Sequence, residues 1–142
     1  MVAAIRVHKT GGPEVLAYEE ITLPPPGPGE IRIVHRAIGV NYIDTYLRGG
    51  LYPVQNFPFV AGNEGAGDVA AVGSGVTDIK VGDRVAYYHS LGGYAQERNL
   101  PADRAVKIPD GISYEQAAGM MLKGMTAQSL LRSVFKVGKD TT

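Results

Sequence analysis

The stretch that decides the fold spans residues 62–85 and reads GNEGAGDVAAVGSGVTDIKVGDRV. Its first glycines, Gly62, Gly65 and Gly67, have the spacing G-x-x-G-x-G. A dinucleotide-binding loop instead has G-x-G-x-x-G and opens a helix that receives the pyrophosphate. The residues that follow, 68–76, alternate and then turn as a strand does. We therefore interpret these glycines as allowing tight strand entry and close backbone approach.

The composition indicates one ordinary globular domain with many turns. At 142 residues the chain has the length of a single domain. Glycine (19) and proline (9) make up about a fifth of it, against about 12% on average. The lack of cysteine excludes a disulfide scaffold, a cysteine zinc site, an iron–sulfur site and a thiol nucleophile. Fourteen basic and fourteen acidic residues give zero formal charge, which argues against a nucleic-acid partner.

Short alternating segments, separated by glycine and proline, fill the first hundred residues. Ala3, Ile5 and Val7 alternate with more polar neighbours, which predicts a half-buried strand. Residues 30–40 predict another, with Ile31, Ile33 and His35 on one face. Further short strands are expected around Val69 and Val72 and over residues 84–88 and 94–97. This arrangement favours a small β-barrel or sandwich.

The character of the chain changes after Pro109-Asp110-Gly111. Ser113 and Gln116 form a capping box that predicts the start of a helix. Gly124 is expected to interrupt it, and a second helical pattern runs from Thr126 to near Gly138. We therefore divide the chain into a domain at residues 1–125 and a helix at 126–142 that leads towards a further domain of a longer enzyme.

Common catalytic and targeting motifs are missing. The sequence has no nucleophile elbow, Walker loop, H-E-x-x-H pair or EF-hand loop. His8, His35 and His89 are scattered, and we interpret each as an ordinary core or surface residue. Arg6 and Lys9 interrupt the apolar N-terminus, so it predicts neither a signal peptide nor a membrane span. The expected location is the cytoplasm.

Taken whole, the deciding stretch resembles the signature of the medium-chain dehydrogenases/reductases. The matching positions are Gly62-x-Glu64-x-x-Gly67, Gly73, Val76 and residues 80–85. The sequence also resembles the zinc-free quinone oxidoreductase (ζ-crystallin-like) group, at residues 8–16, 37–46, 50–53, 113–118 and 122–126. The resemblance implies a mainly β fold with a few helices: the GroES-like β-barrel domain of such an enzyme. Its Rossmann half is absent from this chain.

The resemblance also implies a site without metal. Zinc-dependent members of the family have a histidine ligand between the positions of Gly62 and Glu64, and a cysteine ligand after the strand that ends at Val40. This sequence has Asn63 and Asn41 at those places. An amide is a poor substitute for imidazole or thiolate as a zinc ligand, so we expect no metal, and Glu64 is expected only to hold its loop.

The same resemblance assigns candidate site residues. Asn41, Tyr46 and Tyr52 are the candidate catalytic residues, because an amide and two phenols supply donors beside flat aromatic surface. The residues expected to contact the cofactor NADPH are Asn41, Tyr42, Ile43, Asp44, Thr45, Tyr46, Lys123, Thr126 and Ser129. For Asp44, fixing the loop by hydrogen bonds is favoured over proton chemistry. The tyrosines could instead pack at the barrel edge, and the stripe from Lys123 to Ser129 could be a solvated helix face.

The implied function is the substrate-side domain of a zinc-independent NADPH:quinone oxidoreductase, homodimeric at full length. The isolated chain is expected to be inactive, because the phosphate-binding half is absent. Two alternatives stay open. One is an enone or enoyl double-bond reductase of the same superfamily. The other is a non-catalytic role, as a crystallin-like protein, a nucleic-acid binder or an oligomerising GroES-type module.

Overall fold

The computed structural model describes residues 1–88, 91–135, 137–139 and 141. His89 lies outside these residues. The elements follow the order β1 (Val2–Val7), β2 (Leu16–Ile21), β3 (Glu30–Gly39), α1 (Tyr42–Gly49), β4 (Phe59–Val60), β5 (Glu64–Val72), β6 (Arg84–Tyr88), β7 (Glu97–Pro101), β8 (Ala105–Lys107) and α2 (Tyr114–Ser129). A π-helical turn, Leu130–Val134, continues α2.

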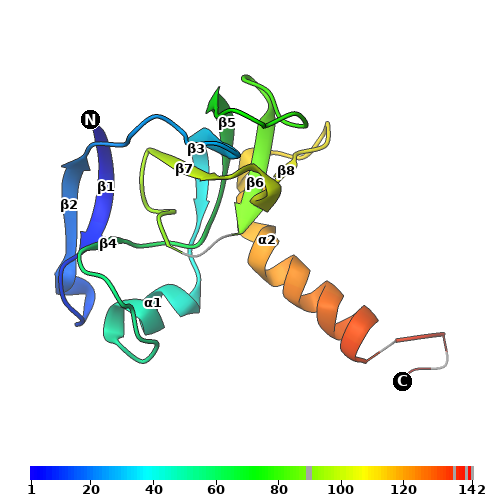
Figure 1. The fold of residues 1–142 in the computed structure, drawn as a ribbon. Coiled ribbons are helices and arrows are strands. Elements are labelled where there is room, and N and C mark those ends of the chain that lie inside the picture. The colour runs from blue at the N-terminus through cyan, green and yellow to red at the C-terminus, as the bar shows by residue number, and fades with distance from the viewer. Residues whose placement is uncertain (89–90, 136, 140, 142) are drawn as a thin grey trace.

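The strands form two antiparallel sheets that lie side by side (Figure 1). One has the order β2-β1-β4 and the other β7-β3-β5-β6-β8. The segment before β7 joins them. The N–H of Ile5 in β1 donates to Tyr94 O (2.7 Å), and the N–H of His35 in β3 donates to Gln96 O (2.8 Å). The mainly β fold with a few helices that the sequence predicts is confirmed.

The main core lies on the five-stranded sheet. Ile31 and Ile33 are fully buried on one face of β3, as predicted, and pack with Tyr87 and Leu100. The prediction for β1 is wrong in its face: Val2 and Ala4 are buried there with Val7, while Ala3 and Ile5 are half-buried. The reason is that both faces of β1 have buried side chains: Val7 packs with Phe59 and Ala61 on one face, and Ala4 is buried on the other.

A hydrogen-bonded pair joins the half-buried His35 of β3 to the fully buried Tyr87 of β6. His35 Nδ1 is 2.6 Å from the carbonyl O of Ala95, and Nε2 is 2.6 Å from the Tyr87 hydroxyl. Since a carbonyl only accepts, Nδ1 carries the proton and Nε2 accepts from Tyr87. Burial lowers the pKa of His35 to about 4, so the neutral ring is the folded form.

Close backbone approach shapes the path of β3 and β5. Two register shifts interrupt their ladder, between Arg32 and Ile33 and between His35 and Ala37. A Cβ at Gly67 would collide with the backbone of Val34. The interpretation of the glycines after residue 62 as permitting close approach, rather than as a phosphate loop, is thus confirmed at Gly67, and β5 is a strand.

Helix α2 begins as the sequence predicts, with a capping box. Ser113 Oγ accepts from the N–H of Gln116 (3.2 Å), and Gln116 Oε1 accepts from the N–H of Ser113 (2.9 Å). The predicted interruption at Gly124 is wrong, since α2 continues through it to Ser129. One glycine costs a helix only about 1 kcal/mol, which neighbouring contacts can offset.

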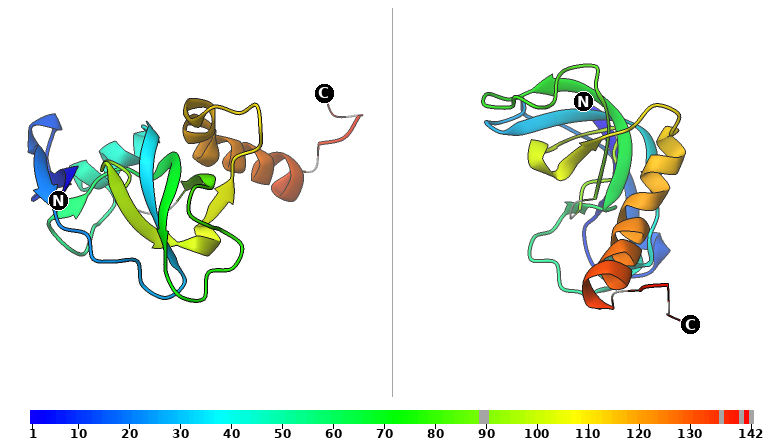
Figure 2. Two further views of the ribbon diagram at one scale, coloured as in Figure 1. Left: turned by 90° about the horizontal axis from the view of Figure 1, so that it is seen from above. Right: turned by 90° about the vertical axis from the view of Figure 1, so that its right-hand side faces the viewer.

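The two halves of α2 have different surroundings. Ala117 and Ala118 pack against the sheet beside Ala66 and Ala86. The second half extends away from the sheets (Figures 1 and 2) and leaves Met125, Leu130 and Phe135 exposed. In the part of the chain that the structure describes, no helix has the length and apolar character needed to span a bilayer.

Replacing His35 by glutamine is expected to flatten the pH dependence of stability. The pKa of His35 falls from 6.5 when unfolded to about 4 when folded, so the unfolded chain binds the proton more tightly between these values. Wild-type stability is therefore complete above about pH 6.5 and declines as the pH falls towards 4, by up to about 3 kcal/mol. Urea unfolding from pH 7 to pH 4.5 measures this. The exposed His8→Gln variant should keep the wild-type slope, and an unchanged slope in His35→Gln would contradict the assignment.

Candidate functional site

Strand pairing brings the two key amides together. In the β3–β5 ladder, Gly39 pairs with Glu64. Asn41 follows the end of β3 and precedes helix α1, while Asn63 immediately precedes β5. Two positions 22 residues apart in the sequence therefore flank one buried point. Both side chains are buried, Asn63 almost completely.

Glu64 is a fully buried carboxylate that joins β5 to two other elements. Its Oε1 accepts from Nδ2 of Asn41 (2.8 Å), and its Oε2 accepts from the backbone N–H of Leu122 in α2 (2.6 Å). Nζ of Lys123 donates to Oδ1 of Asn41 (2.7 Å) and lies 3.6 Å from Oε1 of Glu64. The expectation that Glu64 holds its loop is confirmed by these bonds, which also fix the orientation of the Asn41 amide.

Asp44 is the second buried carboxylate of the site. It accepts from Nδ2 of Asn63, from the backbone N–H of Asn41 (2.9 Å) and from the hydroxyl of Tyr94 (2.7 Å). Burial and the bond to Asp44 raise the pKa of Tyr94, so the phenol stays a donor across the ordinary pH range. Oδ1 of Asn63 in turn accepts from the N–H of Leu91 (3.1 Å).

This arrangement does not fit a catalytic zinc ion. Both amides direct an N–H at a carboxylate, and both amide oxygens already accept a hydrogen bond, from Lys123 and from Leu91. Within residues 1–88, 91–135, 137–139 and 141, no three His, Asp or Glu side chains are placed to hold a metal. The positions where zinc enzymes have ligands thus carry hydrogen-bond donors.

The segment 41–46 was expected to be a loop, but from Tyr42 onwards it is helix α1. The 3.6-residue period therefore separates its side chains. Asp44 is directed into the network described above, whereas Tyr42 is 79% exposed and Thr45 is exposed on the other face. The sequence reasoning missed this because aromatic and polar residues after a strand do not reveal a helix of only eight residues.

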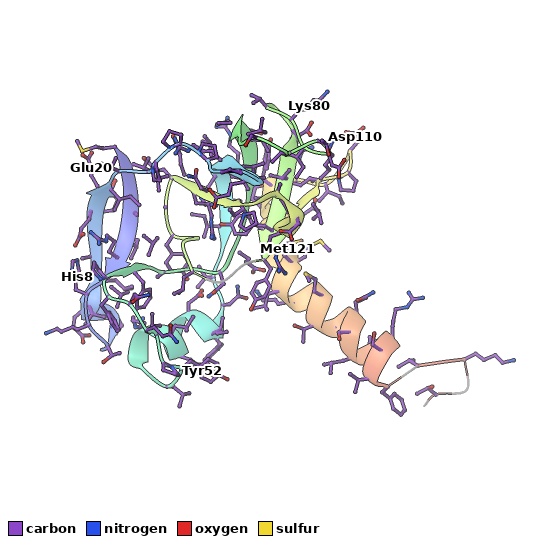
Figure 3. The ribbon with its side chains drawn as sticks, viewed as in Figure 1. His8, Glu20, Tyr52, Lys80, Asp110 and Met121 are labelled. Atoms are coloured by element: carbon purple, nitrogen blue, oxygen red, sulfur yellow. The ribbon has the colours of Figure 1, made fainter. Side chains whose placement is uncertain are left out.

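Tyr46 and Tyr52 form an exposed aromatic pair. Their ring centres are 5.5 Å apart in an edge-to-face arrangement, and Tyr42 lies 6.2 Å from Tyr46. Figure 3 shows Tyr52 beside α1, with Met121 where α2 meets the barrel. Tyr46 is 36% and Tyr52 47% exposed, so both keep surface available for a planar ligand.

Tyr88, at the end of β6, is a site residue that the sequence reasoning missed. It lines one hollow of about 450 Å³ with Ile43 and Asn63, and a second of about 310 Å³ with Thr126 and Ser129. It pairs with Glu64 in the β5–β6 ladder. The sequence places Tyr88 in a strand, but the register that aligns it with Glu64 is set by tertiary pairing.

The stripe from Lys123 to Ser129 shares one face because α2 is continuous. Lys123 joins the Asn41 network, although its side chain is 62% exposed. The hydroxyl of Thr126 donates to the carbonyl O of Leu122 in its own helix (2.7 Å). The structure thus brings Asn41, Asp44 and Lys123 into one network, with Ile43, Thr126 and Ser129 along adjoining hollows.

Gly39→Ala is expected to destabilise the site. A Cβ at position 39 would collide with the carboxylate of Glu64 and lie 2.5 Å from the carbonyl O of Ala118. Separating β3 from Glu64 and α2 should lower the free energy of unfolding by about 1–3 kcal/mol, measured by urea denaturation.

The matched control for this variant is Gly49→Ala, because a Cβ at position 49 meets open space at the end of α1. Its stability should stay within about 1 kcal/mol of wild type. Equal effects of the two substitutions would contradict the packing of Gly39 against Glu64.

Comparison with known proteins agrees with this geometry. Residues 27–110 match the family model described as "Alcohol dehydrogenase GroES-like domain". The chain is 51% identical over 138 residues to a quinone oxidoreductase of Pseudomonas aeruginosa, covering 96% of this chain and 42% of that protein. It is 47% identical over 143 residues to a 2-haloacrylate reductase of Burkholderia, covering 96% and 43%.

A solved structure extends the likeness to three dimensions. The Escherichia coli quinone oxidoreductase complexed with NADPH has a TM-score of 0.94 and 48% identity, over 97% of this chain and 43% of that one. The chain therefore spans less than half the length of these relatives. The resemblance inferred from the sequence motifs is confirmed. The chain belongs to the family of alcohol dehydrogenase GroES-like domains.

Proposed function

We propose that this chain is the substrate-side domain of a zinc-independent NADPH:quinone oxidoreductase. The observation that carries the proposal is the network in which Asn41 and Asn63 fix two buried carboxylates beside an exposed tyrosine pair. Likeness to proteins named quinone oxidoreductase supports it. Such a site offers hydrogen-bond donors and aromatic surface where a zinc enzyme offers a Lewis acid.

NADPH, when bound, would supply the hydride, and this chain would border its nicotinamide end. Residues 62–67 lead into β5 rather than into a helix N-terminus, so this glycine-rich stretch is not a phosphate loop of the dinucleotide type. We assign the phosphates to a second domain. The chain would then orient the acceptor and exclude water from it.

Lys123 is proposed to stabilise the charge that develops on the acceptor. Its ammonium has three donors, of which one bonds to Asn41. With 62% of its side chain exposed, Lys123 can direct another donor at a quinone oxygen that lies at the open side of the network. The buried Glu64 keeps the lysine near Asn41 through their charge interaction.

The aromatic pair Tyr46 and Tyr52 is proposed to hold the planar acceptor. Their edge-to-face packing fixes both rings while leaving about 36% and 47% of the residues exposed. Tyr42, Thr45, Thr126 and Ser129 stay candidates for contact with NADPH, together with Ile43 and Asp44.

The domain division stays part of the proposal. Residues 1–125 would form the substrate-side unit, and residues 126–142 would lead towards the cofactor domain. The exposed apolar side chains Leu130, Val134 and Phe135 support this, because such a row usually packs against another surface. A homodimeric full-length enzyme and a cytoplasmic location stay predictions.

A second candidate is reduction of a carbon–carbon double bond next to a carbonyl group. The 47% identity to a 2-haloacrylate reductase favours it. The same donors would serve an enone, since charge again develops on an oxygen after hydride addition.

A chimera tests the proposal. This chain would replace its aligned 138 residues in the Pseudomonas aeruginosa quinone oxidoreductase, and NADPH oxidation would be followed with benzoquinone and with an enone. We expect faster turnover with the quinone, and none by the 142-residue chain alone. A folded chimera that reduces only the enone would select the second candidate. One that reduces neither would contradict both.

Lys123→Met in the chimera should lower kcat by about a hundredfold, as loss of a donor to developing charge does. The control is Lys80→Met, which removes the same charge from an exposed position. Figure 3 shows Lys80 at the opposite end of the domain from Tyr52. A Lys123→Met chimera with the kcat of its control would exclude Lys123 from the reaction.

A further inference from the structure

Arg98, in β7, is a buried cation that has no carboxylate partner among the described residues. It is 8% exposed, and its Cζ lies 4.9 Å from the ring centre of Tyr87. Within 3.5 Å its guanidinium makes one long hydrogen bond with the described residues, from Nε to Asn99 O (3.5 Å), and a weaker hydrogen bond to the Tyr87 hydroxyl opposes the burial that raises the pKa of that tyrosine. Nη1 is buried and finds no acceptor there, and no carboxylate of those residues lies within 4.0 Å of the guanidinium.

Burying such a group lowers the free energy of unfolding. A buried charge without a partner destabilises the fold, and native proteins hold few buried polar groups without partners. Two other arginines pair with carboxylates: Arg36 bonds to Asp68 (2.7 Å), and Arg6 bonds to Glu19 (3.1 Å). Groups that reduce stability in this way are frequent where a ligand completes the site.

A hollow of about 290 Å³ lies beside Arg98. Gly92 forms part of its wall with a φ of +101°, and a Cβ there would lie only 3.2 Å from Cζ of Arg98. Glycine therefore leaves space between the hollow and the guanidinium that a larger residue would fill. The other walls are largely apolar and come from Ile21, Leu23, Val60 and Ala95.

The charges around the hollow restrict what it can hold. Two carboxylates, Glu30 and Glu97, also line it. They are engaged elsewhere: Glu30 Oε2 accepts from the N–H of Gly27 (2.9 Å), and Glu97 Oε2 lies 3.9 Å from Nε of Arg32. They would repel a dianion more strongly than a monoanion.

We propose that this hollow binds a small monocarboxylate with a short aliphatic tail. The carboxylate pairs with the guanidinium of Arg98, whose planar donors match it. The tail contacts the apolar wall formed by Ile21, Leu23 and Val60. This site is distinct from the Asn41–Glu64–Lys123 network and does not depend on the proposed function.

The test measures Tm of the 142-residue chain with sodium formate, acetate, propionate and butyrate, against sodium chloride and phosphate at equal ionic strength. Propionate at ten times its Kd should raise Tm by about 4 °C relative to chloride. The effect should grow from formate to butyrate, and phosphate should give less. A Tm equal to that in chloride for every carboxylate would mean that water alone solvates Arg98, and would overturn the proposal.

Arg98→Gln should abolish the response and have a Tm in chloride at or above that of wild type, because the unpaired charge is gone. The matched control, Arg36→Gln, loses the same charge at an exposed position and should respond as wild type does. A lower Tm of Arg98→Gln in chloride, or a retained response, would count against the site. If that variant does not fold, the Nε–H resonance of Arg98 in the wild-type ¹H–¹⁵N spectrum decides: a saturable shift with propionate supports the site, and none overturns it.

Discussion

The structure of this site depends on one buried carboxylate. Glu64 has no contact with solvent, so each of its oxygens must find donors within the protein. Those donors come from the residue after β3 and from the backbone of α2. Removing either element would leave a buried charge unsatisfied, at a cost of several kcal/mol. A single side chain therefore fixes where β3 ends, where β5 begins and how α2 lies on the sheet.

The two amides, Asn41 and Asn63, hold the site together by hydrogen bonds. The motif resemblance aligns Asn41 and Asn63 with the metal ligands of zinc-dependent family members, and each donates an N–H to a carboxylate. A metal would have drawn its ligands together by coordination. Here the same convergence is achieved by hydrogen bonds among Asn41, Glu64 and Lys123 on one side and among Asn63, Asp44 and Tyr94 on the other. Lys123 lies 3.6 Å from the buried carboxylate of Glu64, while neutral donors bond to Asp44.

Much of the fold could be read from the sequence, because strand periodicity and capping chemistry are local. Ile31, Ile33 and the Ser113–Gln116 capping box are examples. The motif resemblance supplied the family. What local reasoning missed depends on tertiary contact. Gly124 does not end α2, which is held just before that glycine by the contacts of Leu122 with Glu64 and of Lys123 with Asn41. Tyr88 and Tyr94 belong to the site only because the ladder and the barrel closure bring them there, and no spacing in the sequence records that.

The continuity of α2 has a mechanical consequence. Residues 114–129 form one rod whose first turns are anchored on the sheet and whose far end stands clear of it. Lys123 sits near the point where the anchored part gives way to the free part. A second domain that contacted the free end would shift Lys123 with it, because the backbone hydrogen bonds of the helix make it stiff. Contact at the end of α2 and the position of the Lys123 ammonium would thus be coupled through one helix.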